Sequence, residues 1–336
     1  IIKMNELQKD PHQSLRLRSG FDRAVSSIRD RFDSVYGGFG GTPKFPPYAV
    51  MRLLIAQQDF SMVHHTLTQM ALSGLYDQVE GGFHRYSTDA EWHLPHFEKM
   101  LMDNAQMIEI YSLMHQQESQ SLYERIVFET IQHLLTQWRL PDGGFLSTMD
   151  ADSDGEEGHY YVARYDELKP LVSSSLFDAW VAYFQMTEPG NMLDEATGDL
   201  TGFNVFHPLS DQPTFDLDQF RQVLTDFRIQ HRQAPAKDNT VVISANAWLA
   251  KALYLASDVF SNSDWHALAD QLMDLVLTMI KQNPTTVYLD DVVYALSAAI
   301  NGHRPITDCE WLWGILMDQF YDDIQGGLWY SQEDHR

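Results

Sequence analysis

The chain has little cysteine, no long apolar run, and few basic residues for its number of acids. Its one cysteine, Cys309, excludes an internal disulfide framework and a CxxC redox pair, and it suits a cytoplasmic location. No stretch approaches the roughly 20 apolar residues that a membrane-spanning helix requires, so we expect no membrane partner. Lys and Arg total 23 against 47 Asp and Glu, a formal charge of −24. Because such a surface repels phosphates, we expect no nucleic acid partner either.

The size and the first residues say something about the boundaries of the chain. At 336 residues it is long enough for one large domain or two ordinary ones. Its start, Ile1-Ile2-Lys3-Met4, has neither an initiator Met nor the pattern of a signal peptide. We therefore expect the true N-terminus to lie upstream.

Apolar residues recur at helical spacing along most of the chain. Trp265, Leu268, Leu272 and Val276, for example, share one face of a helix. Such stripes predict helices over residues 21–34, 46–58, 60–74, 95–117, 120–139, 243–258, 263–282, 289–301 and 307–321. Short turns join eight of these helices into four hairpins, and longer loops separate most of the hairpins.

Most of the long loops carry a paired-glycine motif. Paired glycines permit positive φ in a tight turn, and the hydrophobic residue that follows can anchor the returning chain. The motif occurs as Tyr36-Gly37-Gly38-Phe39, Glu80-Gly81-Gly82-Phe83, Asp142-Gly143-Gly144-Phe145 and Gln325-Gly326-Gly327-Leu328. A helical hairpin that repeats in step with one kind of loop is typical of a ring of hairpins.

We therefore predict an all-α fold of the α/α-toroid type, a six-hairpin barrel with short β-hairpin-like loops on one rim. The loops should gather the ligand site on that rim. We expect a single domain over residues 1–336 with a rim insertion at about 166–240. The helices are too few for a closed six-hairpin ring, so we expect the last ones to be missing at the C-terminus.

The densest run of polar and aromatic residues spans 76–101. We predict that five of its residues contact the ligand: Tyr76, Asp77, Arg85, Tyr86 and Trp92. Tyr86 or Trp92 would be the ring on which a sugar stacks. Pro95 suits the first turn of a helix, which would place His96 and Glu98 there as proton-transfer groups. Lys99 and Asp103 would pair along the same helix. Alternatively, these side chains only cap the helix and join it to the loop.

An acidic segment begins Asp150-Ala151-Asp152-Ser153-Asp154-Gly155, like an EF-hand calcium loop. Its twelfth position is Tyr161 where a bidentate Glu is required, so we predict no metal site. We interpret Asp150 as a catalytic candidate and Asp152 as a ligand contact on the rim. No motif requires an organic cofactor.

Two kinds of sugar chemistry remain open. A glycosidase needs two carboxylates at a set separation, and its candidates are Asp77, Glu98, Asp150 and Asp152. A sugar epimerase needs a base and an acid on opposite faces of the substrate, and its candidates are His84, His96 and His207. Asn246 and Asp291, on later helices, are further candidate ligand contacts.

Long motifs of the chain resemble the thioredoxin-domain-containing proteins related to spermatogenesis-associated protein 20. These motifs are Gly37-Gly38-Phe39-Gly40-Gly41-Thr42-Pro43-Lys44-Phe45-Pro46, Gly74-Leu75-Tyr76-Asp77-Gln78, Gly81-Gly82-Phe83-His84-Arg85-Tyr86-Ser87, Pro95-His96-Phe97-Glu98-Lys99-Met100-Leu101, Asp150-Ala151-Asp152-Ser153, Glu157-Gly158-His159-Tyr160-Tyr161-Val162 and Gly202-Phe203-Asn204-Val205. The resemblance covers nearly the whole chain. It implies a barrel similar to N-acylglucosamine 2-epimerase and six-hairpin glycosidases, preceded in the full-length protein by a thioredoxin-like domain that this chain lacks.

The chain departs from that family at two places. Relatives have an Asp-Asp-Lys stretch and then Trp-Asn-Gly, where this chain has Asp238-Asn239-Thr240 and Ala245-Asn246-Ala247. The toroid and its rim of His, carboxylate and aromatic residues favour a first hypothesis, a carbohydrate-processing enzyme that is epimerase-like or glycosidase-like. The departures and the acidic surface favour the alternative, a non-catalytic binding or scaffolding domain that partners the thioredoxin-like domain.

Overall fold

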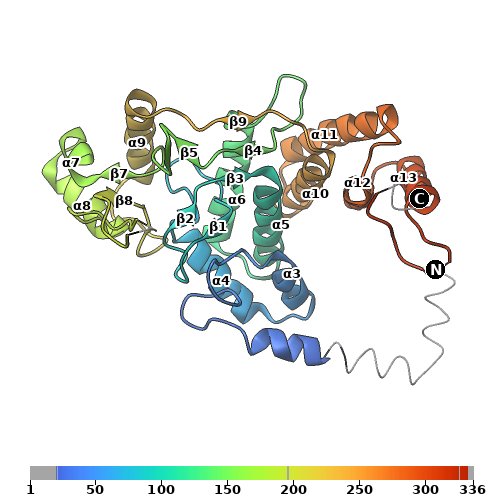
Figure 1. Cartoon of the computed structure of the whole chain (residues 1–336), viewed down its shortest axis with the longest axis horizontal. Coiled ribbons are helices and arrows are strands. Elements are labelled where there is room, and N and C mark those ends of the chain that lie inside the picture. Colours follow the sequence, from blue (N-terminus) through green and yellow to red (C-terminus); the bar gives the residue numbers. More distant parts are fainter. Residues whose placement is uncertain (1–19, 21, 195–196, 325, 332–336) are drawn as a thin grey trace.

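The computed structural model of the chain describes residues 20, 22–194, 197–324 and 326–331. Four helical hairpins follow one another through it in an arc, and each joins an inner helix to an outer one (Figure 1). The inner helices are α3 (Tyr48–Ala56), α5 (Leu101–Gln117), α10 (Ile243–Phe260) and α12 (Leu289–Asn301). The outer helices are α4 (Phe60–Ala71), α6 (Ser121–Gln137), α11 (Ser263–Gln282) and α13 (Ile306–Gln319).

The contacts between helices are those of an α/α toroid. Helix α5 packs against α3 and α10, and α10 packs against α12, so the inner helices form one continuous layer. Each outer helix packs against the inner helix of its own hairpin. The predicted fold class is confirmed.

Burial along the helices explains the two layers. In α11 the buried residues, among them Leu268, Leu272 and Val276, lie on one face, as in a helix with solvent on its other side. In α5 every residue from Met107 to Ser112 is buried, so this helix is surrounded by protein. The inner helices therefore carry polar residues into the interior, where they either pair or face a cavity.

Three of the paired-glycine loops form the same turn, and the third loop is one residue shorter, with positive φ at Gly143 alone. Single bridges close them between Phe32 and Phe39, Tyr76 and Phe83, Arg139 and Phe145, and Tyr321 and Leu328. Gly82 has φ of +79°, and a Cβ atom on it would lie 2.8 Å from the His133 ring. Glycine is required there both for the backbone and for the space. The second, third and fourth loops follow the outer helices α4, α6 and α13, and the second and third bond to Asn104 and Asn246 near the N-terminal ends of α5 and α10.

Short antiparallel strands connect these loops. Their bounds are β1 (Tyr86–Ser87), β2 (Pro95–His96), β3 (Lys99–Met100), β4 (Thr148–Met149), β5 (Asp152–Ser153), β6 (Glu156–Glu157), β7 (Ala163–Arg164), β8 (Phe203–Asn204) and β9 (Lys237–Asp238). Strand β1 pairs with β2, β4 lies between β3 and β9, β5 pairs with β6, and β7 pairs with β8.

The predicted helix over 95–117 is wrong at its start. Pro95 and His96 form β2, Lys99 belongs to β3, and the helix begins only at Leu101. The backbone of this segment is extended because it pairs with Tyr86 on one side and with Met149 on the other. Proline at the first residue of a short strand is as acceptable as proline in a first helical turn.

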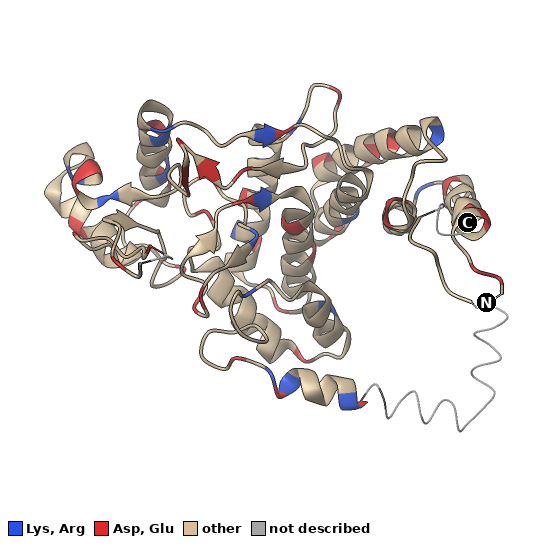
Figure 2. Ribbon diagram, in the orientation of Figure 1, with Lys and Arg blue, Asp and Glu red and all other residues tan. Residues whose placement is uncertain are grey.

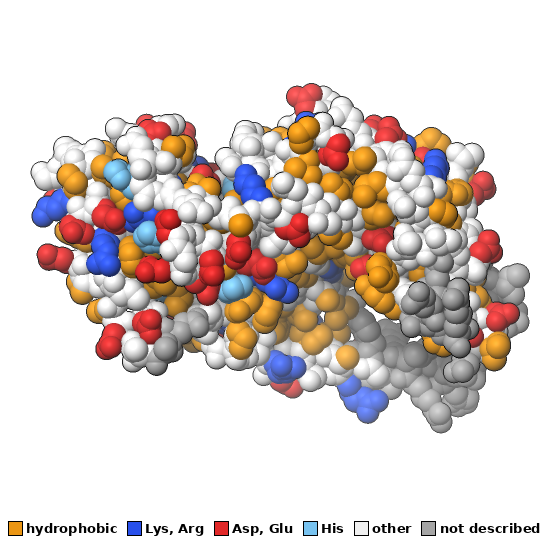
Figure 3. All heavy atoms as spheres, turned by 45° about the horizontal axis from the view of Figure 1, so that its top comes forward, with side chains coloured by type: hydrophobic (Ala, Val, Ile, Leu, Met, Phe, Trp, Pro, Cys, Tyr) orange, Lys and Arg blue, Asp and Glu red, His pale blue; other side chains and the backbone are white. Residues whose placement is uncertain are grey.

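The region predicted as a rim insertion contains α7 (Tyr165–Leu168), a short 3₁₀ helix (Lys169–Leu171), α8 (Ser174–Phe184) and α9 (Leu217–His231). It has an apolar cluster of its own around Trp180, Phe184 and Phe220. Charges are distributed over the whole ribbon, and acidic side chains are scattered over the face in Figure 3 with basic ones among them (Figures 2 and 3).

Candidate ligand-binding site

A cavity of about 690 Å³ opens at the N-terminal ends of the inner helices. All four inner helices contribute polar or aromatic side chains to it, namely Tyr48, Arg52, Gln106, Trp248, Asp290 and Tyr294. The first turns of α3, α5 and α12 lie here, so the cavity is at the end of the toroid to which the glycine loops lead.

One buried carboxylate organises the floor of this cavity. Glu109 of α5 accepts hydrogen bonds from Arg52 Nη2 at 2.8 Å, Lys251 Nζ at 2.7 Å and Trp248 Nε1 at 2.9 Å. Burial raises the pKa of Glu109, but Arg52 and Lys251 outweigh burial and hold the pKa below its usual value. Both cations also lie over the Trp248 ring, at 4.7 Å and 4.9 Å from its centroid.

Asp103, in the first turn of α5, is a carboxylate with a single hydrogen bond to the cavity lining. Its Oδ1 atom accepts a hydrogen bond of 3.2 Å from the Tyr48 hydroxyl, and its buried Oδ2 atom has no partner among the described residues. Burial raises the pKa of Asp103 to about 6, with Arg85 and Glu98 acting on it as lesser charges. Such a pKa suits a group that exchanges a proton near neutral pH.

Four of the predicted site residues form a cluster at the rim. Arg85 donates to Glu98 at 2.9 Å, and the Tyr86 ring stacks on His96 with centroids 4.9 Å apart. His96 Nδ1 lies 2.6 Å from Glu157 Oε1, and this hydrogen bond raises the pKa of His96. The charges of this rim cluster also act on Asp103: Arg85 lowers its pKa and Glu98 raises it.

Asp77 lies in a separate, fully buried ion network. Lys99 Nζ donates to its Oδ2 at 2.9 Å, and Arg228 of α9 contacts its Oδ1 at 3.1 Å. Arg228 also donates to Glu80 at 3.0 Å. The predicted Lys99–Asp103 pair is therefore wrong, because Lys99 lies on a strand and turns toward Asp77. This network joins the insertion to the second glycine loop.

The three histidine candidates have different surroundings. His84 is buried, where burial lowers its pKa to about 3, and its Nδ1 atom is 2.9 Å from the Phe97 carbonyl. His96 is on the rim. His207 packs against His93 in the insertion, and burial lowers its pKa to about 4. None of the three is among the residues that line the cavity.

Two predicted aromatic contacts are buried. Trp92 has no exposed surface and donates its indole N–H to the Tyr36 carbonyl at 2.8 Å, so its ring is not available for stacking a sugar. Tyr76 is buried as well, and its hydroxyl donates to Glu129 at 2.6 Å.

The remaining predicted residues lie on neighbouring elements. The Asn246 amide bonds to both the N–H and the carbonyl of Phe145, at 2.9 Å and 3.1 Å, which leaves it no group for a ligand. Asp291 accepts from the backbone of Ser244 and Tyr288, both at 2.9 Å, and so ties α12 to α10. Asp150 and Asp152 are exposed in the β4–β5 turn and do not line the cavity.

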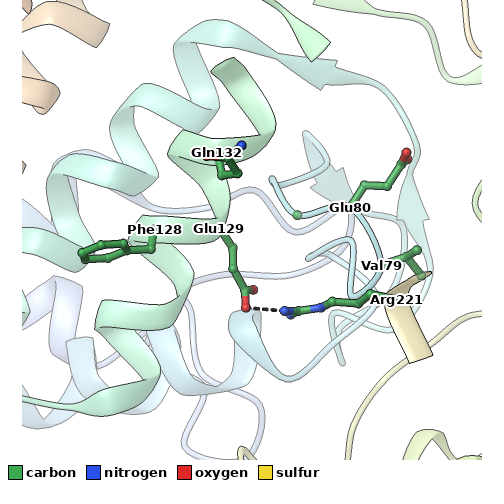
Figure 4. A pocket seen from close by; sticks show the side chains of 7 residues that line it. Val79, Glu80, Phe128, Glu129, Gln132 and Arg221 are labelled. Carbon is green, nitrogen blue, oxygen red and sulfur yellow. Dashed lines mark ion pairs between the residues drawn. The ribbon is translucent and has the colours of Figure 1, made fainter. Parts of the chain in front are cut away.

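A second cavity, of about 390 Å³, lies on the outside of the toroid between α6, α9 and the second glycine loop (Figure 4). Its charged side chains are already paired: Arg221 lies 2.6 Å from Glu129, which also accepts from Tyr76. Figure 4 shows this ion pair extending from α6 to α9. We interpret this cavity as the seam where the insertion docks.

Among the described residues, no group of three or more His, Cys, Asp or Glu is placed to hold a metal ion. None of the described helices is both long and apolar enough to cross a bilayer.

Comparison of the sequence with known proteins finds curated relatives but no matching family model. The human protein named spermatogenesis-associated protein 20 is 35% identical over 212 residues, which are 55% of this chain and 27% of that protein. The chain is a sequence relative of spermatogenesis-associated protein 20. An uncharacterized protein of Caenorhabditis elegans is 31% identical over 284 residues, 73% of this chain and 39% of the relative. The chain thus spans well under half the length of these relatives.

Solved structures with a distant likeness to the chain include sugar-active proteins. A family 76 glycoside hydrolase from a Bacteroides thetaiotaomicron strain covers 79% of this chain and 41% of its own, with 8% identity and a TM-score of 0.41. Cellobiose 2-epimerase from Bacillus thermoamylovorans covers 92% of this chain and 91% of its own, with 10% identity and a TM-score of 0.34.

Sequence reasoning missed the residues around the cavity, chiefly Arg52, Asp103, Glu109 and Trp248. The predicted site residues lie mostly in polar loops, whereas these four side chains lie on helices. The available signal was a set of polar residues inside helices that are otherwise apolar on several faces, as in α5.

Proposed function

We propose that the chain is a carbohydrate-processing domain whose ligand occupies the cavity at the N-terminal ends of the inner helices. The observation that supports this proposal best is Asp103. It combines a pKa of about 6, one buried oxygen without a described partner, and a hydrogen bond from Tyr48, which lines a cavity of ligand size.

The chemistry of the lining suits a sugar. Sugars bind through ring faces stacked on aromatic side chains and through hydroxyls held by polar groups. Because Arg52 and Lys251 lie over the Trp248 ring, we assign the stacking surfaces to Tyr48 and Tyr294. Gln106 and Asp290 supply hydrogen-bonding groups.

Of the two reactions left open by the sequence, we assign the glycosidase-like one to this site. That reaction needs two carboxylates: Asp290 of α12 lines the cavity, and Asp103 of α5 bonds to Tyr48, which lines it too. In our assignment Asp103 protonates the leaving oxygen and Asp290 acts as the base or nucleophile. The epimerase-like reaction through histidine is less well supported, because none of His84, His96 and His207 lines the cavity.

The proposal is tested by a screen of aryl glycosides and oligosaccharides for turnover, together with ligand-induced shifts of the melting temperature. In the variant Asp103→Asn we expect kcat to fall about 10²–10⁴-fold with the melting temperature retained. The matched control is Asp258→Asn, an exposed position near the far end of α10. Turnover that is equal in both variants would rule out the assignment of Asp103.

The alternative, a non-catalytic scaffold for a thioredoxin-like domain, has one observation in its favour. In the rim cluster the charged side chains of Arg85, His96 and Glu98 already have protein partners. A well-folded protein that neither binds nor turns over any sugar in the screen would favour this alternative.

A further inference from the structure

Arg52 presents unused hydrogen-bond donors where it lines the cavity. Its Nε and one N–H of Nη2 serve Glu109, and the other N–H of Nη2 serves Gln106 at 3.0 Å. A guanidinium group has five N–H donors, so two remain on Nη1. Neither of these has a partner among the described residues, although the side chain is only 24% exposed.

The charges under this part of the cavity are unequal. Arg52 and Lys251 carry two positive charges, and both are paired with the single carboxylate of Glu109. The Trp248 ring and its N–H complete this cluster and bring no charge. This cluster therefore carries one net positive charge, within a protein whose formal charge is −24.

The acidic groups of the site come from other helices than Arg52. Arg52 belongs to α3, Asp103 to α5 and Asp290 to α12. Arg52 and Asp290 both line the cavity, so a ligand in it meets a cation from one helix and a carboxylate from another.

We infer that the cavity selects an acidic sugar, a uronic acid unit whose carboxylate binds the free Nη1 donors of Arg52. This inference rests on the proposed function, because it assigns the substrate class of the same site. Arginine suits the role, since its planar guanidinium matches carboxylate oxygens and stays charged at any physiological pH. The sugar ring then lies between Tyr48 and Tyr294, and its glycosidic bond extends toward Asp103.

The test compares sugars that differ only at C6. D-glucuronate is titrated against D-glucose, and D-galacturonate against D-galactose, by calorimetry at low ionic strength, with glucose 6-phosphate as a second anionic arm. We expect each uronate to bind about tenfold more tightly than its neutral counterpart, which corresponds to one charge-assisted contact. Added salt should reduce this preference.

Arg52→Gln should abolish the preference, so that it binds each uronate and its neutral counterpart with the same affinity. Arg139→Gln, which removes the same charge from an arginine that donates to Gln271 outside the site, should leave the preference unchanged. If Arg52→Gln does not fold, Arg52→Lys carries the test: it keeps the charge beside Glu109 but lacks the planar fork, so the preference must fall severalfold.

The outcomes separate the two proposals. Equal binding of uronates and neutral sugars would overturn the acidic-sugar inference and leave the carbohydrate function standing. A preference for the phosphate over the uronates would overturn the choice of a carboxylate. No binding of any sugar, by a folded protein, would overturn both.

Discussion

At the scale of single residues, the environment of Asp103 shows how the inner layer tunes a carboxylate without a salt bridge. Burial disfavours its charged form, and the single hydrogen bond from Tyr48 compensates only in part. By contrast, Glu109, six residues further along α5, is equally enclosed but paired with two cations, and its pKa moves the other way. The difference between the two acids lies in their partners.

This environment predicts how stability depends on pH. The pKa of Asp103 is about 6 in the folded state and 3.8 when unperturbed, so between these values the folded chain binds a proton that the unfolded chain has released. The associated stability is fully present below pH 3.8 and is lost as pH rises through 6. Asp103→Asn removes this loss. Relative to wild type, its free energy of unfolding should rise by about 1–3 kcal/mol between pH 4 and pH 7.

Urea denaturation of both proteins across this pH range checks the prediction. The control is Asp258→Asn, which makes the same substitution at an exposed position of α10 outside the site. A constant difference for Asp103→Asn would show that Asp103 titrates normally.

At the scale of elements, two asparagines attach the glycine loops to the inner helices. Asn104 of α5 bonds to the N–H and carbonyl of Phe83, at 2.7 Å and 3.1 Å, and Asn246 of α10 does the same for Phe145. Each asparagine is the fourth residue of its helix. The repeat therefore includes a side chain that bonds to the loop as a neighbouring strand would.

Replacing either asparagine should destabilise the toroid. Asn104→Ala or Asn246→Ala leaves a buried backbone donor and acceptor unpaired, at a cost of about 2–4 kcal/mol. Asn301→Ala removes an exposed amide from the last residue of α12 and should cost less than about 0.5 kcal/mol. Chemical denaturation measures all three, and equal effects would mean that the loops are held by packing alone.

The elements also show where sequence reasoning succeeded and where it could not. The hairpins were predictable because an outer helix such as α11 has one apolar face, and the glycine loops because paired glycines mark a tight turn. Strand β2 could not be predicted, since Pro95 suits either the start of a helix or a strand. Only the pairing of this segment with Tyr86 makes it a strand. Burial of His84 and Trp92 depends equally on distant segments.

At the scale of the whole molecule, Arg228 joins the insertion to the toroid. It reaches from α9 to Asp77, 151 residues earlier in the chain, and to Glu80 in the same loop. No local sequence pattern predicts such a contact, although an arginine on the buried face of an amphipathic helix indicates that it has a buried partner. Lys99 also binds Asp77, so one loop carboxylate links the insertion, the toroid loop and strand β3.

Removing Arg228 should therefore loosen the whole insertion and not only one contact. In Arg228→Met, Glu80 loses its cation and Asp77 keeps only Lys99, which should cost about 2–4 kcal/mol because the carboxylates are left partly uncompensated. Gln222→Met, at an exposed position of the same helix, serves as the control and its free energy of unfolding should be nearly that of wild type.

Amide hydrogen exchange shows whether the insertion opens on its own or together with the toroid. We expect α8 and α9 to exchange faster in Arg228→Met while α5 and α10 keep their protection, because the insertion has its own apolar cluster and can open separately. If exchange instead rises equally in α5 and α10, the insertion and the toroid unfold as one unit, and Arg228 is part of a single cooperative core.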